Sequence, residues 1–258
     1  MRQDRRGLGG DQVEGRQAVR ELLLAERRKV REVWVSGRDA DGGQLEGPLA
    51  DLADLAGDLR VPVRVVGRSK LDAAARTDAP QGVVAFAAPL PEVDLDDLMK
   101  PKGGEPPFVV ALDGVTDPGN LGAVLRAAEC SGVTGAVLPR HRAVHVTPAA
   151  AKAAAGAIEH VPMAVVPGLP AALARLKGAG LWVVGLDSAG DTPLHDLPVA
   201  SDPVVLVLGA EGAGLSRLVR QRCDLLAAIP LHGRLASLNV AAAAAVATYE
   251  IARHRAAG

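Results

Sequence analysis

The feature that most constrains the fold is a repeated alternation, from Phe108 onward, of short apolar runs with helical patterns. The apolar runs are short enough to be buried strands. They lie at 108–114, 135–139, 161–166, 181–187, 204–208 and 225–229. Helical spacing is found at 120–132, 147–156 and 168–180, and a last helix is expected from 241 to about 255. This alternation predicts an α/β fold with a mostly parallel sheet covered on both faces.

A smaller αβ unit is expected before this sheet. Helices are expected at 15–28, 45–55 and 69–76, the last capped by Ser69, and strands at 33–35, 61–66 and 82–88. We therefore expect a disordered tail over 1–12, a small domain over 13–88 and a second domain over 107–258. Between the domains, the proline-rich and acidic stretch 89–106 is typical of a linker.

Composition limits the kinds of function. The 258 residues are 48% hydrophobic but only 2% aromatic, so the core must consist of Ala, Val and Leu. The only two cysteines, Cys130 and Cys223, lie far apart, so we expect no disulfide and two buried thiols. No apolar run has the length of a membrane span and no signal segment precedes the domains, which favours the cytoplasm.

The net charge of −1 does not by itself suggest a nucleic-acid partner. Basic residues outnumber acidic ones over 1–38, so this part of the surface could contact phosphates. A solvated surface explains the same excess equally well.

Two glycine-rich turns each follow an apolar run and precede a helix. The first contains Gly209, Glu211, Gly212 and Gly214, and the second lies at 230–239. Glycine lets backbone groups approach a ligand, and helix N-termini offer free N–H donors. A flexible turn explains one such loop, but two together favour a ligand cradle.

A third polar cluster begins at the turn Asp117–Asn120 and includes Arg126 on the helix that follows. A lone arginine on a helix is usually solvated or ion-paired. His141 and His145 are the nearest approach to a metal motif, but no third ligand accompanies them, so no metal is expected.

In this order, the three clusters resemble the three motifs of the SpoU (TrmH-like) family of knotted RNA methyltransferases. The matching residues are Asn120, Gly122 and Arg126 in the first motif, Gly209, Glu211 and Gly212 in the second, and Pro230, Gly233, Ser237, Leu238, Asn239 and Val240 in the third. Ala241 departs from the family pattern, where a serine is frequent. Gly15, Ala18, Val19 and 81–84 resemble the RNA-binding domain of the family members that methylate 23S rRNA.

The resemblance implies a carboxy-terminal trefoil knot, a homodimer packed through the knot and S-adenosylmethionine as methyl donor. It places the cofactor at Gly185, Leu186, Leu208, Gly209, Ile229, Ser237 and Leu238. It assigns catalysis to Arg126, Asn120, Glu211 and Asn239. For Glu211, bracing the loop remains as strong an alternative as substrate contact, and Asn239 could cap its helix instead.

The function implied is 2′-O-ribose methylation in 23S rRNA, most simply of a guanosine. The alternatives are a tRNA substrate, an rRNA adenosine whose methylation confers antibiotic resistance, and a non-catalytic ribosome-assembly factor that binds RNA. A nucleotide-dependent oxidoreductase is disfavoured, because no strand is followed by the dinucleotide fingerprint.

Overall fold

The computed structural model describes residues 7–37, 45–140 and 146–257, and the chain forms two compact units. The first unit comprises Met1–Pro91 and, from much later in the chain, His145–His160. The second comprises Glu92–Val144 and Val161–Gly258. No helix in the described ranges is long and apolar enough to span a membrane.

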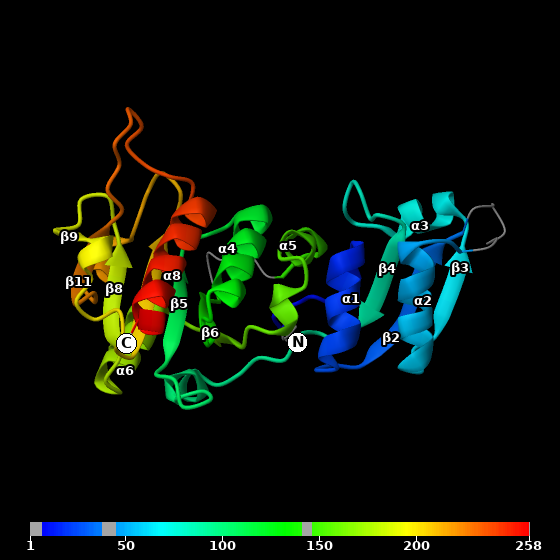
Figure 1. The fold of residues 1–258 in the computed structure, drawn as a ribbon, viewed down its shortest axis with the longest axis horizontal. Helices are drawn as coiled ribbons and strands as arrows, with labels where there is room; N and C mark the ends of the chain where they lie inside the picture. The colour runs from blue at the N-terminus through cyan, green and yellow to red at the C-terminus, as the bar shows by residue number, and fades with distance from the viewer. Residues whose placement is uncertain (1–6, 38–44, 141–145, 258) are drawn as a thin grey trace, which may run out of the picture. The chain divides into compact units, whose positions relative to one another are not determined.

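The first unit is built on a four-stranded sheet with the order β1-β4-β2-β3. The strands are β1 (Gln12–Glu14), β2 (Val30–Ser36), β3 (Val63–Val66) and β4 (Val83–Ala87), and only β2 and β3 run parallel. The helices α1 (Arg16–Ala25) and α2 (Pro48–Asp58) pack on one face, and α3 (Arg68–Ala74) packs on the other (Figure 1).

The late segment of the first unit contains α5 (Pro148–Ala153) and the short 3₁₀ helix η2 (Ala157–Glu159). Glu159 forms a buried ion pair with Arg28, in which both side chains are almost fully inaccessible to solvent. Arg28 donates to both carboxylate oxygens, over 3.0 and 2.5 Å, and also to the carbonyls of Gly10 and Ala88. Every polar atom of the pair therefore has a partner, which is what a buried charge requires.

The second unit contains a seven-stranded sheet with the order β7-β6-β5-β10-β8-β11-β9. Its strands are β5 (Phe108–Asp113), β6 (Gly135–Pro139), β7 (Met163–Val166), β8 (Trp182–Leu186), β9 (Thr192–Pro193), β10 (Val204–Gly209) and β11 (Leu225–Ala228). All neighbouring strands run parallel. This arrangement confirms the predicted mostly parallel α/β sheet.

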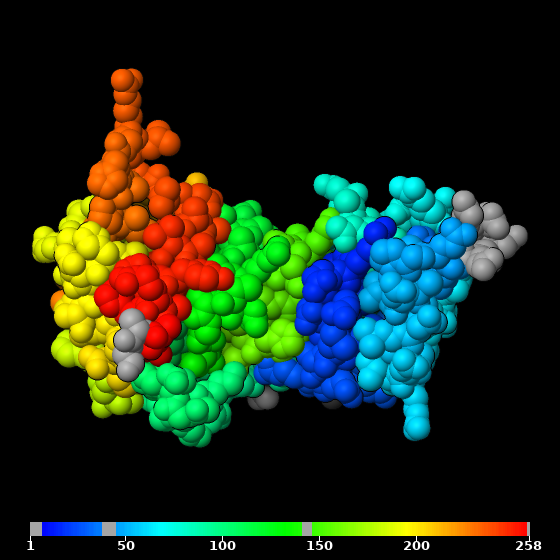
Figure 2. All heavy atoms as spheres, in the orientation of Figure 1, coloured from blue at the N-terminus to red at the C-terminus, as the bar shows by residue number. Residues whose placement is uncertain are grey.

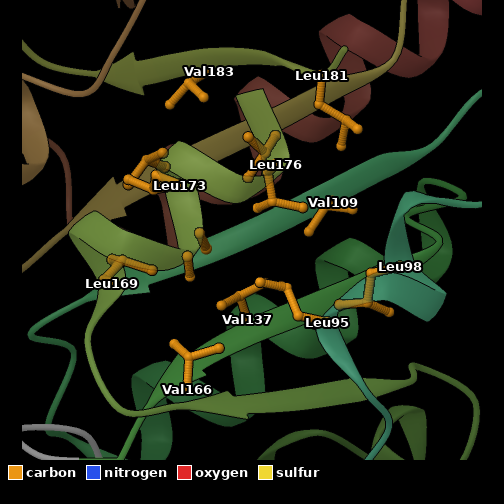
Figure 3. Close-up of a cluster of buried hydrophobic side chains, with 14 of the residues drawn as sticks. Leu95, Leu98, Val109, Val137, Val166, Leu169, Leu173, Leu176, Leu181 and Val183 are labelled. Carbon is orange, nitrogen blue, oxygen red and sulfur yellow. The ribbon is translucent and has the colours of Figure 1, made fainter. Parts of the chain in front are cut away.

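Helices cover both faces of this sheet, as expected. The helices are η1 (Leu95–Met99), α4 (Pro118–Cys130), α6 (Leu169–Gly178), η3 (Leu194–Asp196), α7 (Arg217–Arg220) and α8 (Val240–Ala257). Alternate strand residues point to opposite faces, so Val109 and Val137 pack with α6 and η1 in one cluster (Figure 3). On the other face, α4 and α8 lie side by side (Figure 1).

Several details differ from the sequence-based expectations. The third helix begins at Arg68 with Gly67 as its N-cap, so Ser69 is not the cap that we expected. Strands β1 and β9 were not expected, because β1 is polar yet buried and β9 has only two residues. Cys130 is exposed rather than buried, since it lies on the solvent side of the last turn of α4.

The units also divide the chain differently from the contiguous domains that the sequence suggested. Of the expected tail, residues 1–6 lie outside the described ranges, whereas Leu8 is 1% exposed. In the expected linker, Leu95 and Leu98 are buried in the core of the second unit. Residues 145–160, which we expected in the second domain, pack in the first unit.

Candidate active site

The candidate site lies where four neighbouring strands of the second unit end. Because β5, β10, β8 and β11 are adjacent and parallel, their carboxyl ends lie along one edge of the sheet. The loops after them contain the three polar clusters found in the sequence. Parallel α/β sheets characteristically bind ligands at this edge.

The loop after β10 folds back on itself within five residues. Ala210 and Gly214 exchange backbone hydrogen bonds of 3.1 and 2.8 Å, and Gly212 and Gly214 have φ angles of 76° and 65°. A Cβ on Gly209 would lie 2.3 Å from the carbonyl carbon of Gly214. Only glycine therefore fits at the end of β10, and the tight loop displays Glu211 at its tip.

Beside this loop is a cavity of about 330 Å³. Of the residues expected to hold a cofactor, those in the cavity wall are Leu186, Leu208, Gly209, Ile229, Ser237 and Leu238. Glu211 also lines the cavity. Gly185 does not line it; it is buried behind the side chain of Leu215, which would lie 2.7 Å from a Cβ at this position.

The segment between β11 and α8 supplies part of the cavity wall. It contains no helix or strand, and residues 231–239 are all exposed. Figure 2 shows this segment, in orange, extending away from the body of the second unit. The cavity is therefore open to solvent on this side.

Three of the expected catalytic residues form one hydrogen-bonded cluster. The Nδ2 amide of Asn239 donates to Asn120 Oδ1 over 3.0 Å and to Glu211 Oε2 over 3.4 Å. Asn120 Nδ2 also donates to Glu211 Oε2, over 3.4 Å. Each member comes from a different sequence motif, and all three side chains belong to exposed or half-buried residues beside the cavity. The structure thus brings the three motifs together.

Two of these residues lie at capped starts of helices. Asp117 caps α4 by accepting from the backbone N–H of Asn120 over 2.7 Å. Asn239 Oδ1 accepts from the N–H of Ala241 over 2.8 Å at the start of α8. Asn239 therefore caps its helix, which is one of the two roles considered from the sequence, and its amide also joins the cluster.

Arg126 is separate from this cluster. It is exposed on α4, does not line the cavity, and makes no hydrogen bond or ion pair with any other described residue. Its guanidinium is therefore available to a group that is not part of this chain.

Three charged residues at the site were not predicted from the sequence: Asp113, Asp187 and Arg220. Asp113 Oδ2 accepts from the N–H of Ser216 over 2.6 Å, which ties the end of β5 to the loop after β10. Asp187 and Arg220 form an ion pair in the cavity wall. Asp113 and Asp187 each follow a buried strand, and that position was the signal that could have identified them.

Cys223 lies beneath the site, where its Sγ would be 2.8 Å from a Cβ on Gly185. Burial raises the pKa of this thiol to about 11. The thiol is therefore protonated at neutral pH and acts as an apolar packing group.

The described residues contain no cluster of His, Cys, Asp or Glu that could hold a metal ion. His141 and His145, the pair considered in the sequence, lie outside the described residues.

The fold and site define a parallel α/β protein with a backbone-lined cavity and an Asn–Glu–Asn cluster at its mouth. A model of the SpoU rRNA Methylase family matches residues 107–249, and a model described as RNA 2'-O ribose methyltransferase substrate binding matches residues 12–93. The chain belongs to the SpoU rRNA methylase family. The resemblance seen in the three sequence motifs is thereby confirmed.

Similar proteins match nearly the whole chain. The putative TrmH family tRNA/rRNA methyltransferase YacO of Bacillus subtilis is 38% identical over 247 residues, covering 95% of this chain and 96% of that protein. The 23S rRNA (guanosine-2'-O-)-methyltransferase RlmB of Pseudomonas putida is 37% identical over 248 residues, covering 95% and 97%. The crystal structure of the SpoU methyltransferase AviRb from Streptomyces viridochromogenes, in complex with AdoMet, superposes with a TM-score of 0.78 at 27% identity, covering 96% and 91%.

Proposed function

We propose that this protein transfers the methyl group of S-adenosylmethionine to a ribose 2′-oxygen in 23S rRNA, most simply that of a guanosine. The observation that carries the proposal is the Asn120–Glu211–Asn239 cluster at the mouth of the cavity. The names of the relatives support the RNA substrate, and the AdoMet complex of AviRb supports the methyl donor.

The residues of the cavity suit this cofactor. Leu186, Leu208 and Ile229 offer apolar contacts to an adenine ring, and the glycine loop after β10 exposes backbone groups. The ion pair of Asp187 and Arg220 adds both signs of charge in the same wall, which matches a ligand with amino and carboxylate groups. We propose that the wall residues and Gly185, behind them, form the cofactor site.

S-adenosylmethionine supplies a methyl group that is already activated by its positive sulfur. The protein must therefore place the ribose 2′-oxygen in line with that methyl group and help it lose its proton. Asn120, Glu211 and Asn239 would hold this geometry. A guanidinium group stays protonated in proteins and is a poor general base, so we assign Arg126 to binding an RNA phosphate or orienting the hydroxyl group.

We further propose a homodimer formed through α8. The exposed side of this helix carries Ala242, Val246 and Tyr249 in one stripe, and Val246 and Tyr249 are 45% and 53% exposed. Such an apolar stripe is typical of a surface covered by a partner. The dimer would place Arg126, on the neighbouring helix α4, near a second copy. Family membership supports a trefoil knot in the segment that precedes α8.

The two family models suggest a separate role for each part of the chain. We propose that residues 107–258 carry the catalytic site, that residues 13–88 bind RNA, and that the protein acts in the cytoplasm, where rRNA is made. The substrate-binding model over residues 12–93 supports the second assignment.

To test the function, the protein is incubated with labelled S-adenosylmethionine and either unmodified 23S rRNA or tRNA. The 2′-O-methyl sites in each RNA are then mapped. We expect transfer to a single guanosine of 23S rRNA. Transfer to tRNA, or to an adenosine of the rRNA, would show that the substrate is that nucleotide and not a guanosine of 23S rRNA. No transfer to either RNA, with cofactor binding intact, would leave only an RNA-binding role.

A further inference from the structure

We propose that a groove on the first unit, which shares no residue with the cavity of the second, binds the sugar–phosphate backbone of the RNA. The inference rests on the proposed function, because it concerns the same RNA. We call it the arginine groove. It is a surface hollow of about 840 Å³ whose wall includes Arg16, Arg68, Arg76, Gln81 and Gly82.

Buried polar side chains hold one wall of the groove in a fixed shape. Glu14 is fully buried, and its carboxylate accepts from the N–H groups of Arg76 and Thr77 over 2.7 and 3.1 Å. Gln12 is also buried and donates to Glu14 and to the carbonyl of Ala74. These bonds explain why the polar strand β1 is buried: it organises the loop after α3.

The other end of this loop has an unusual backbone. Gln81 has a φ of 59°, and Gly82 has a φ of 77°. A Cβ on Gly82 would lie 2.6 Å from Ser36 Oγ. Arg16 holds this turn, because its N–H donates to Gln81 Oε1 over 2.9 Å and its Nε donates to the Gln81 carbonyl over 3.2 Å. A non-glycine residue held at positive φ is often found where backbone strain serves binding.

The cations of the groove are exposed and only partly neutralised. Arg76 has no side-chain partner among the described residues, and Arg16 uses only its Nε. Arg68 meets Asp72 over 3.7 Å, at 87% and 52% side-chain exposure, and such a pair is weak. Among the described residues, the acidic ones that line the groove are Asp72 and Asp78, against three arginines, so these residues leave one positive charge in excess.

The chemistry of the wall indicates a phosphate backbone rather than bases. None of the described residues that line the groove is aromatic, so the bases of the RNA have no ring there on which to stack. Guanidinium groups bind phosphate oxygens in a bidentate manner, and such contacts position an RNA without reading its sequence. Several separate cations around a hollow of this size suit a run of phosphates better than one small anion.

The test compares the full-length triple variant Arg16→Ala/Arg68→Ala/Arg76→Ala with the control Arg31→Ala. Arg31 is an exposed arginine near the opposite end of β2 from Ser36, and it does not line the groove. Binding to an unmodified 23S rRNA transcript is measured by filter binding from 50 to 300 mM salt. Methyl transfer, cofactor affinity and thermal unfolding are measured alongside.

We expect the triple variant to bind the transcript about 10 to 100 times more weakly, with the slope of log affinity against log salt reduced by about 0.7 for each arginine that meets a phosphate. KM for the RNA should rise, while kcat and cofactor affinity should match those of Arg31→Ala. The unfolding midpoint should fall by no more than a few degrees, because the backbone N–H of residue 16 still donates to Gln81. Equal RNA affinity in the triple variant and the control would overturn the proposal that the arginine groove binds RNA. Because binding is measured without transfer, a wild type that binds the transcript but methylates nothing would refute only the proposed function.

Discussion

The side-chain amide of Asn239 donates to Asn120 Oδ1 over 3.0 Å, which joins the start of α8 to the start of α4 across 119 positions of sequence. The same asparagine caps α8 through its other side-chain atom. A single side chain thus holds two helices and one loop at the mouth of the cavity.

Replacing Asn239 separates these two roles. Asn239→Ser keeps an N-cap oxygen but removes the amide donor to Asn120 and Glu211. We therefore expect kcat/KM to fall about 100-fold, because the transition state is less well stabilised, with little loss of protein stability. Asn239→Ala should lose the same activity and also about 1 kcal/mol of stability. Transfer kinetics and thermal unfolding measure both effects. Full activity in Asn239→Ser would mean that the asparagine serves only as a cap.

If Arg126 contacts the RNA as proposed, Arg126→Ala should reduce methyl transfer by at least about 100-fold, because an electrostatic contact in the transition state would be lost. The side chain is exposed and makes no hydrogen bond or ion pair with another described residue, so folding and cofactor affinity should not change. Arg222→Ala is a matched control, since Arg222 is also exposed in the second unit. Methyl-transfer kinetics measure the activity of both variants, and isothermal titration with S-adenosylmethionine measures their cofactor affinity. A loss of cofactor affinity in Arg126→Ala would show that the arginine binds the cofactor instead.

Gly209→Ala should weaken cofactor binding by more than about 10-fold and destabilise the protein by about 1 to 3 kcal/mol. The added methyl group would collide with the backbone of Gly214, so the loop that lines the cavity must move. Gly178→Ala is the control, because nothing lies within 4 Å of a Cβ at the end of α6. If both variants bind S-adenosylmethionine like the wild type, the loop after β10 is not part of the cofactor site.

Glu159→Gln should destabilise the first unit by about 3 to 5 kcal/mol, because the buried guanidinium of Arg28 would lose its counter-charge. The double variant Arg28→Met/Glu159→Leu removes both charges and should be more stable than Glu159→Gln. Chemical denaturation monitored by circular dichroism compares the three proteins. A double variant less stable than Glu159→Gln would contradict this account.

The pKa of about 11 at Cys223 predicts a distinctive reactivity. In a Cys130→Ala background, labelling of the native protein by iodoacetamide should rise steadily between pH 8 and 10, because the thiolate fraction keeps growing tenfold per pH unit there. The unfolded protein should instead level off near the ordinary thiol pKa of about 8.5. Because the folded-state pKa is raised, ionisation of this thiol also lowers stability as the pH rises above the unfolded value. Identical pH profiles for the two states would refute the burial of Cys223.

The sequence was sufficient to predict the alternation of strands and helices in the second unit, because each buried strand is a continuous apolar run. It could not predict β1, since Gln12 and Glu14 are polar residues whose burial depends on partners more than sixty positions away. The motif residues Asn120, Glu211 and Asn239 were found through a family resemblance. Their hydrogen bonds depend on the order of parallel strands, which no local pattern contains.

The interrupted first unit has a consequence for how this protein is made. Arg28 leaves the ribosome long before Glu159, so a nascent chain that ends before residue 160 holds a cation for which no counter-charge has yet been synthesised. The amino-terminal unit therefore cannot reach its final state first, as consecutive domains usually do. It must wait until strands β5 and β6 of the second unit have been synthesised, because both strands precede Glu159 in the chain. The last part of the first unit is therefore made before the second unit is complete, since strands β7 to β11 follow it.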